Sequence, residues 1–309
     1  MNQAVRILRR LPPAYPALLT LVLAAVVLRP QLLSPMLLPL ILRQAAPLGI
    51  ATIGQSLVMR SMSLDLSLGG VVAGVSYILT SGLLPLPGYA LLLVCLAFGA
   101  LIGVINGTLV VVFRASSVIV TMAMTMVLLG TVLALTQTRA PGEAPEFLRA
   151  FGRARVAGVP MPVYVWAGVL LPFALALKRT VFGRYMDAWG ANQRAAHVSG
   201  IPGERVMFVS HVLCSLCAAA AGVTLLAIVG VGSMNIGQDL ALNALVAAIF
   251  GGVNFGHGRG GMLGPAVGAL MLTFLLNFLT SLGLGEPGRL MLEAALLAMA
   301  ALAYSLRNR

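Results

Sequence analysis

The sequence predicts an all-α, polytopic integral membrane protein with about ten transmembrane helices, some of them broken, and with both termini in the cytoplasm. Hydrophobic residues make up 60% of the 309 residues, charged residues make up 9%, and the mean hydropathy is +1.00. A water-soluble domain carries roughly 25% charged residues. Several apolar windows approach or exceed the roughly 20 residues needed to cross a bilayer core. We therefore expect a single transmembrane domain over residues 1–309.

Ten apolar windows are expected to span the membrane, and the second and eighth are short and interrupted by glycine. We expect these two to be broken or steeply tilted. Residues 29–44, which contain three prolines, are expected to form an interfacial connection. Arginines precede the first window, which we interpret as an uncleaved span rather than a secretory signal. The windows are 14–28, 45–60, 66–84, 88–113, 116–137, 161–178, 206–229, 239–252, 262–281 and 288–306.

The net charge of +12 reflects membrane topology rather than nucleic-acid binding. The arginines are scattered at span ends and do not gather on one face with stacking aromatic residues. With the N-terminus inside, most of the 20 basic residues lie on the cytoplasmic side, as the positive-inside rule requires. This orientation places residues 178–205 in the cytoplasm.

No catalytic, nucleotide or metal-binding motif is visible. The chain has no P-loop and only one lysine, Lys178. His197, His211 and His257 stand apart, and His211, inside a span, is expected to hydrogen-bond between helices. The pair Cys214-x-x-Cys217 lies in an apolar helix without a second ligand pair, so we expect buried structural cysteines. We therefore expect that the chain is not an enzyme and that it binds no cofactor or metal itself.

Two polar or glycine-rich segments interrupt the apolar spans. In the first, SMSLDLSLGG, Asp65 is interpreted either as a functional intramembrane carboxylate or as the N-cap of a helix that starts at Leu66 and offers the Leu68 N–H. The second, residues 251–268, reads GGVNFGHGRGGMLGPAVG. Its glycines predict a cytoplasmic turn followed by a closely packed helix.

The segment 178–205 reads KRTVFGRYMDAWGANQRAAHVSGIPGER and predicts a short helical pair. Drawn as one helical wheel, Tyr185, Trp189 and Ala196 share a side with Ala188, Asn192 and Ser199. One interpretation is an element that docks into a partner's groove. The other is an amphipathic loop that rests on anionic lipid headgroups. The residues alone leave both interpretations open.

Four motifs in order resemble the permeases of ribose-, xylose- and galactose-type ABC importers, within the branched-chain-amino-acid and sugar permease superfamily. They are SMSLDLSLGG, GVINGTLVVVFRASSVIVTMAM, GRYMDAWGANQRAAHVSGI and GGVNFGHGRGGMLGPAVGAL. The resemblance runs from about Leu42 to Tyr304. The chain departs from the family pattern where Met62 and Ser63 replace two glycines, and where the proline of a Pro-Phe-Ile-x-Thr motif is Ser117.

This resemblance implies a multi-pass protein of the bacterial inner membrane that works with several partners. Two ATPase subunits would hold ATP, a periplasmic binding protein would deliver the substrate, and a second permease copy or paralogue would complete the pathway. The ATPase-coupling residues that the resemblance implies are Gly183, Arg184, Tyr185, Trp189, Gly190, Asn192, Ala195, Ala196, Ser199, Gly200 and Ile201. Polar residues within spans that are candidates for the translocation pathway, or alternatively for helix–helix hydrogen bonds, are Asp65, Ser67, Asn106, Thr121 and Asn277.

The function expected from these observations is import of a monosaccharide by alternating access, driven by a separate ATPase. One alternative is a permease on the same scaffold for a branched-chain amino acid or a furanose signal. A second is an ion-coupled secondary transporter, for which Asp65 and Glu293 are the acidic candidates. A non-transporting membrane scaffold is the third.

Overall fold

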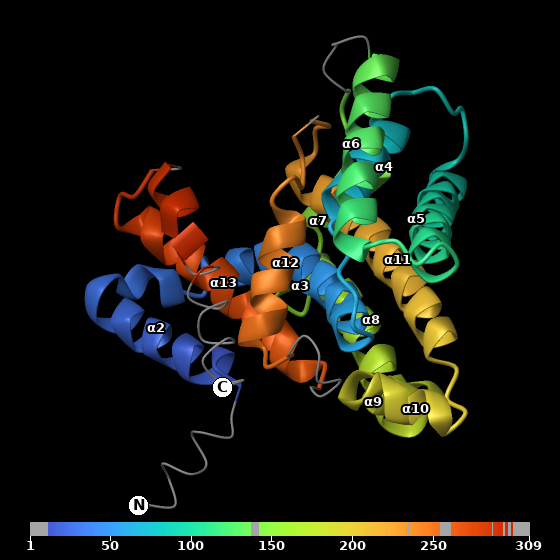
Figure 1. Ribbon diagram of the computed structural model, residues 1–309. Coiled ribbons are helices and arrows are strands. Elements are labelled where there is room, and N and C mark those ends of the chain that lie inside the picture. Colours follow the sequence, from blue (N-terminus) through green and yellow to red (C-terminus); the bar gives the residue numbers. More distant parts are fainter. Residues whose placement is uncertain are drawn as a thin grey trace, which may run out of the picture.

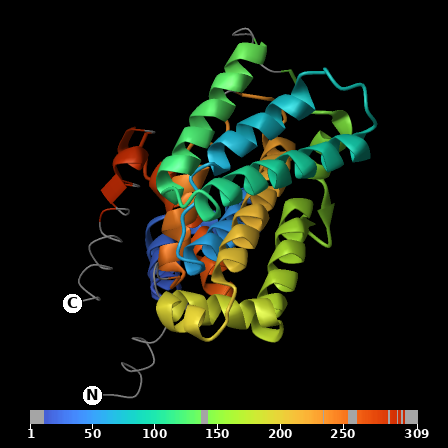
Figure 2. The same ribbon diagram turned by 45° about the vertical axis from the view of Figure 1, so that its right-hand side comes forward.

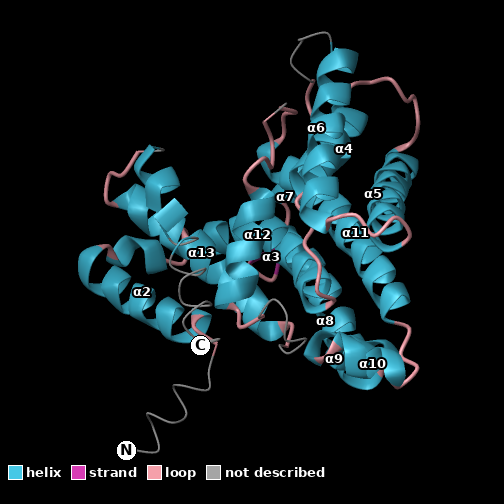
Figure 3. Ribbon diagram, viewed as in Figure 1, coloured by secondary structure: helices cyan, strands magenta, loops and turns pink. Residues whose placement is uncertain are grey.

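The computed structural model describes residues 12–136, 142–233, 235–253, 261–285, 287–292, 294–295 and 298, and its regular structure is almost entirely helical (Figures 1 and 3). The two short strands pair antiparallel as a hairpin ahead of α8. The elements with assigned bounds are α2 (Ala14–Leu28), η1 (Pro30–Leu33), α3 (Leu38–Arg60), α4 (Leu68–Thr80), α5 (Gly88–Val111), α6 (Ser117–Thr136), α7 (Glu146–Arg153), β1 (Arg155–Val156), β2 (Val159–Pro160), α8 (Met161–Arg179), α9 (Val181–Ala191), α10 (Gln193–Val198), α11 (Gly203–Val229), α12 (Leu240–Phe250) and α13 (Leu263–Ser281).

Helices occupy nine of the ten predicted windows, and most of the tenth, 288–306, lies outside the described residues. Within the described ranges, five helices are long and apolar enough to cross a membrane, namely α5, α6, α8, α11 and α13. The helices α2, α4 and α12 are apolar but shorter, and α12, with 11 residues, confirms that the eighth window is short. The polytopic, all-α class is therefore confirmed, while the count of ten crossings stays a prediction.

Two expectations about the first part of the chain are wrong. Residues 38–44 belong to α3 rather than to an interfacial connection, which shortens the true connection to η1 and a turn. The second window is correspondingly not short, because α3 runs for 23 residues. Pro39 lies in the first turn of α3, where its missing N–H removes no helical hydrogen bond.

The second half of α3 lies at the centre of the molecule, where every residue from 45 to 60 is buried. Its neighbours include α11, α12, α13 and α8. Because protein surrounds this half of the helix, the polar side chains of Thr52, Gln55 and Ser56 do not face lipid. The neighbouring helix α2 packs separately against α13.

The helices α5 and α11 approach each other along a stripe of glycines. Gly99, Gly103 and Gly107 recur every fourth residue on one face of α5. A Cβ at Gly99 would lie 2.7 Å from the Ser215 carbonyl oxygen, and one at Gly103 would lie 2.6 Å from the Val212 Cα. Small residues at this spacing allow the two backbones to pack closely, as they do in membrane helix pairs.

The helices α9 and α10 lie together at one end of the bundle, at the bottom of both Figure 1 and Figure 2. The two helices confirm the short helical pair that was predicted within residues 178–205. The 19-residue helix α8 joins this pair to the β1–β2 hairpin and α7. A helix of that length spans roughly 28 Å. The α7 helix and the α9–α10 pair therefore lie at opposite ends of α8, which is long enough to cross a membrane.

Replacing Gly103 with valine tests the close approach of α5 and α11. The added side chain would meet the α11 backbone, and overpacking of this kind costs about 1–3 kcal/mol. We expect Gly103→Val to melt at a clearly lower temperature than the wild type in detergent, as measured by size-exclusion chromatography after heating. Gly130→Val on α6 is the matched control, because a Cβ there meets nothing within 4 Å. Equal melting temperatures for both variants would contradict this packing.

Candidate functional site

The break between α9 and α10 is built by side-chain capping. The Thr180 hydroxyl caps α9 and accepts from the Gly183 N–H at 3.5 Å. Asn192 has an extended backbone, with φ −161°, which ends α9. Its Oδ1 accepts from the Ala195 N–H at 3.0 Å and so caps α10. The sequence Gly-Ala-Asn-Gln therefore makes a corner rather than continuing one helix.

This corner makes the single helical wheel wrong, because its two halves point in different directions. The buried side of α9 carries Gly183, Met186 and Gly190 instead of Tyr185 and Trp189, which are half-buried. Met186 was missed by sequence reasoning, although its spacing of three and four residues from the two glycines is a signal for a buried stripe.

The predicted coupling residues occupy three kinds of environment on this segment. Gly183, Gly190 and Ala196 are buried within the chain itself. Tyr185, Trp189 and Ile201 are half-buried. The exposed members are Arg184, Asn192, Ala195, Ser199 and Gly200. The structure adds Val198, an apolar side chain with 84% of its surface exposed at the end of α10.

Two glycines hold this segment tightly against the helices next to it. A Cβ at Gly183 would lie 2.0 Å from the Leu177 carbonyl oxygen of α8. At Gly203, the first residue of α11, a Cβ would lie 1.8 Å from the Trp189 ring. These contacts pack the segment against both α8 and α11, which suits an element that transmits motion.

An ion pair connects α9 to the central helix α3. Nη2 of Arg60, the last residue of α3, donates a hydrogen bond to Oδ1 of Asp187 on α9. The Arg60 side chain is 4% exposed and the Asp187 side chain is 55% exposed. Arg60 immediately precedes the non-helical residues 61–67, so the ion pair lies beside the junction of α3 and α4.

Apart from the Arg60–Asp187 ion pair, a cluster of buried polar side chains surrounds Asp65 inside the helix bundle. We call this cluster the polar seam. Its members, which come from the α3–α4 break, α5 and α11, are Ser63, Asp65, Ser67, Asn106, His211 and Ser215. Asn106 Nδ2 donates to Ser67 Oγ at 2.9 Å. Ser63 Oγ and His211 Nε2 are hydrogen-bonded at 2.8 Å. His211 thus forms a hydrogen bond across the bundle as expected, but its partner lies in the α3–α4 break rather than in another helix.

Asp65 does not cap a helix that starts at Leu66, so that expectation is wrong. The helix α4 begins at Leu68, and Asp65 Oδ1 accepts instead from the Ser67 N–H at 2.8 Å and from Ser67 Oγ at 2.6 Å. Asp65 Oδ2 accepts from Ser215 Oγ at 3.4 Å and lies 3.7 Å from His211 Nδ1. The carboxylate thus organises the break and joins it to α11.

Hydroxyl groups on α6 satisfy the backbone of the same break. The Leu64 N–H donates to Ser117 Oγ at 3.2 Å, and the Leu66 N–H donates to Thr121 Oγ1 at 2.9 Å. Thr125 Oγ1 donates in return to the Leu66 carbonyl at 2.8 Å. Thr121 was singled out as a pathway candidate, and the structure gives it this supporting contact.

Met62, one of the two departures from the glycine pattern of the family, adopts a left-handed backbone conformation with φ 70°. Glycine adopts such a conformation without steric cost, whereas a residue with a Cβ pays roughly 1–2 kcal/mol. Met62 therefore occupies a backbone conformation that would suit a glycine at this position.

Four of the five pathway candidates are brought together, and the fifth is not. Asp65, Ser67, Asn106 and Thr121 meet around the α3–α4 break, and each has no exposed surface. Asn277 lies on α13, where its Nδ2 donates to Gln44 Oε1 and to the Thr273 carbonyl, both at 2.9 Å. A role for these residues in translocation stays a prediction, and in this conformation the first four face other protein groups.

The glycine-rich segment is described only at its two ends, because His257 and Arg259 lie outside the described residues. A Cβ at Gly264 would lie 1.9 Å from the Gly251 carbonyl oxygen, and one at Gly268 would lie 2.1 Å from that of Ala247. These distances confirm close packing of α13 against α12.

The remaining candidates for chemistry offer no site in the part of the chain that the structure describes. Cys214 and Cys217 are free and buried, as predicted. Among the described residues, no group of three or more His, Cys, Asp or Glu side chains could hold a metal ion.

Comparison with known proteins finds permeases along most of the chain. The family described as "Branched-chain amino acid transport system / permease component" matches residues 37–304. The ribose import permease protein RbsC of Escherichia coli (strain K12) is 31% identical over 268 residues, covering 85% of this chain and 83% of that protein. RbsC of Bacillus subtilis (strain 168) is 30% identical, covering 96% of this chain and 92% of that protein. The galactofuranose transporter permease protein YtfT of Escherichia coli (strain K12) is 32% identical, covering 75% and 69%. These matches confirm the resemblance drawn from the four motifs.

Replacing Asp65 tests whether the polar seam holds the break together. Asp65→Leu would leave the buried Ser67 N–H and the hydroxyls of Ser67 and Ser215 without this acceptor, at about 1–3 kcal/mol for each group. Asp65→Asn is the matched control, because its amide oxygen still accepts. We expect the melting temperature in detergent to fall in the order wild type, Asp65→Asn, Asp65→Leu. A leucine variant that melts at or above the asparagine variant would contradict this role.

Proposed function

Since this chain belongs to the family of permease components of branched-chain amino acid transport systems, we propose that it is the membrane-spanning subunit of an ATP-driven importer of monosaccharides. The sugar class rests on relatives that are named as ribose and galactofuranose permeases. Other relatives, named as autoinducer 2 import permeases, are 28% identical, so related scaffolds carry more than one solute.

The observation that carries this proposal is the α9–α10 corner at one end of the bundle. It joins two helices that suit membrane spans, α8 and α11, and presents exposed polar groups together with the exposed Val198. In an importer whose ATP is bound by a separate subunit, the permease needs a docking surface through which the movement of that subunit is transmitted. The corner supplies a compact surface of this kind, and its glycine contacts tie it to the transmembrane helices.

The proposed mechanism runs from this corner to the centre of the bundle. An ATPase bound below α10 would move α9 and α10 as one body when it closes on ATP. The Arg60–Asp187 ion pair would pass that displacement to the end of α3. The α3–α4 break begins at the next residue, so the displacement would change how α3 and α4 pack and switch access to the pathway.

The proposed orientation places α9, α10 and both termini in the cytoplasm of a bacterium, with α7 on the periplasmic side. A periplasmic binding protein would then deliver the substrate at the α7 end. A second permease copy or paralogue would complete the pathway, and ATP would be hydrolysed by two partner subunits. The basic side chains of Lys178, Arg179, Arg184, Arg194 and Arg205 at the α9–α10 end support this orientation.

Replacing the exposed Val198 with glutamate tests the docking surface. Because 84% of this side chain is exposed, the variant is expected to fold and insert like the wild type. A docked ATPase would bury the new charge, which costs several kcal/mol and weakens binding by at least roughly tenfold. We expect loss of the co-purifying ATPase and of sugar uptake.

Val156→Glu is the matched control for that test, because Val156 is 53% exposed in β1 at the opposite end of α8. It should keep the ATPase bound. Ala196, which the sequence alone suggests for such a test, is a poor choice, since it is 4% exposed and its replacement would disturb α10 itself. Full co-purification and uptake with Val198→Glu would contradict docking at α10.

Removing Asp187 tests transmission separately from docking. Asp187→Ala deletes the carboxylate that contacts the buried Arg60, and because Asp187 itself is half-exposed the ion pair is worth about 1 kcal/mol. We expect the ATPase to remain bound while uptake falls by up to roughly fivefold. Glu204→Ala removes another exposed acid near the same corner without touching α3. Equal uptake by the two variants would contradict transmission through Asp187.

A further inference from the structure

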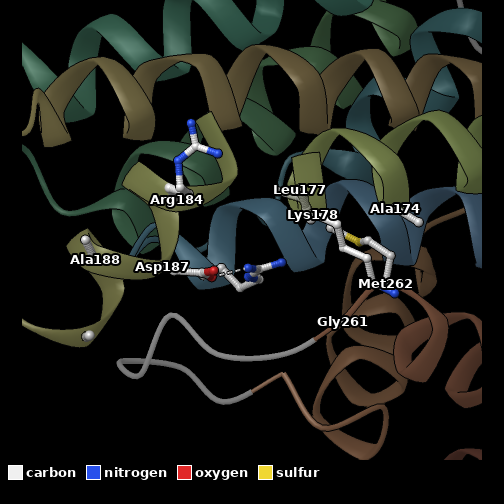
Figure 4. A pocket seen from close by; sticks show the side chains of 10 residues that line it. Ala174, Leu177, Lys178, Arg184, Asp187, Ala188, Gly261 and Met262 are labelled. Atoms are coloured by element: carbon white, nitrogen blue, oxygen red, sulfur yellow. Dashed lines mark hydrogen bonds and ion pairs between the residues drawn. The ribbon is translucent and has the colours of Figure 1, made fainter. Parts of the chain in front are cut away.

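A cavity of about 690 Å³ lies between α3, α8, α9 and the start of α13, beside the α9–α10 corner (Figure 4). Figure 4 shows Asp187 and Arg184 on one side and Lys178 and Met262 on the other. Arg60, which also lines the cavity, pairs with Asp187. The proposed mechanism uses the Arg60–Asp187 pair on the wall of this cavity but gives the cavity itself no occupant. Its lining combines charged groups with a patch of apolar wall.

The charged groups of the cavity have an excess of positive charge. Arg60, Lys178 and Arg184 line it, and Asp187 is the one acidic side chain among its described lining residues. Asp187 pairs with Arg60. In the described part of the chain, neither Lys178 nor Arg184 forms an ion pair. Two cations are therefore available to an anion.

The apolar wall comes from the membrane-spanning part of the structure. Ala174 and Leu177 lie in the last two turns of α8, a helix suited to cross the bilayer, and Met262 precedes α13. Lys178 lies in the final turn of α8. The cavity thus lies at the end of a helix that is suited to cross a membrane, with cations beside an apolar wall.

We propose that this cavity binds the headgroup of an anionic phospholipid, with Lys178 and Arg184 on its phosphate and the Ala174–Leu177–Met262 wall against its glycerol backbone and first acyl carbons. Basic pockets between transmembrane helices on the cytoplasmic side bind anionic headgroups in other membrane proteins. The cytoplasmic location rests on the orientation proposed above. A bound lipid would fill the space between α8 and α9 and brace the Arg60–Asp187 contact.

The proposal is tested with the permease alone, purified in detergent and titrated with phosphatidylglycerol, with retained lipid counted by native mass spectrometry. Each cation near a membrane surface contributes a factor of roughly five in binding, so the double variant Lys178→Gln, Arg184→Gln should bind about 30-fold more weakly. The matched control, Arg194→Gln with Arg205→Gln, removes the same charge from the same segment outside the cavity and should bind like the wild type.

A steric variant separates a lipid from a free phosphate. Ala174→Phe fills part of the apolar wall without changing the charge, so it should displace phosphatidylglycerol, whereas a site for phosphate alone would tolerate it. Phosphatidylcholine should be retained less than phosphatidylglycerol by the wild type. Equal retention of the two lipids, equal retention by the cavity and control variants, or full retention by Ala174→Phe would overturn the proposal. Because no ATPase is present, this outcome is independent of whether α10 docks one.

Discussion

The rest of the structure depends on one constraint. The backbone N–H and C=O groups in the break between α3 and α4, residues 61–67, must find hydrogen-bond partners. Within a hydrocarbon core an unsatisfied N–H or C=O costs several kcal/mol, so an irregular segment is tolerated only where protein surrounds it. Here the hydroxyls of Ser117, Thr121 and Thr125 bond the backbone of residues 64 and 66. Asp65 bonds the Ser67 N–H and hydroxyl. The polar side chains in the spans therefore have a structural task before any functional one.

Close packing of the surrounding helices follows from the same constraint. The polar seam extends across α5 and α11, which must approach closely enough for Asn106 and His211 to reach the break. The glycines of α5 make that approach sterically possible. Arg60 lies directly before the break and contacts Asp187 on α9. The α9–α10 corner, the central helix α3 and the break after it consequently form one connected structure, and the proposed coupling of an ATPase to the pathway rests on this connection.

The sequence was sufficient for most of the helices, including the short pair α9 and α10, but not for the direction of the corner between that pair or for the contacts between helices. Apolar windows located nine helices because lipid and protein interiors select the same residues. The start of α3 was missed because three prolines made residues 29–44 look like an interfacial connection. In the structure Pro39 lies in the first turn of α3, Arg43 Nη2 donates to the Ile228 carbonyl at 3.1 Å, and Gln44 bonds Asn277. The acceptor role of Asp65 was misassigned because the sequence did not show that α4 begins at Leu68 or that Ser215 of α11 contacts this carboxylate. Contacts with residues distant in sequence thus help to determine where these helices begin.

The most direct test of the central claim is transport by proteoliposomes that contain the permease together with the ATPase and the binding protein proposed for it. A labelled monosaccharide that the binding protein retains is supplied outside, and its accumulation is measured with and without ATP at the ATPase face. We expect accumulation above the outside concentration only with ATP, unaffected by a protonophore. Accumulation that persists without ATP and collapses with the protonophore would contradict the account and make the chain an ion-coupled transporter.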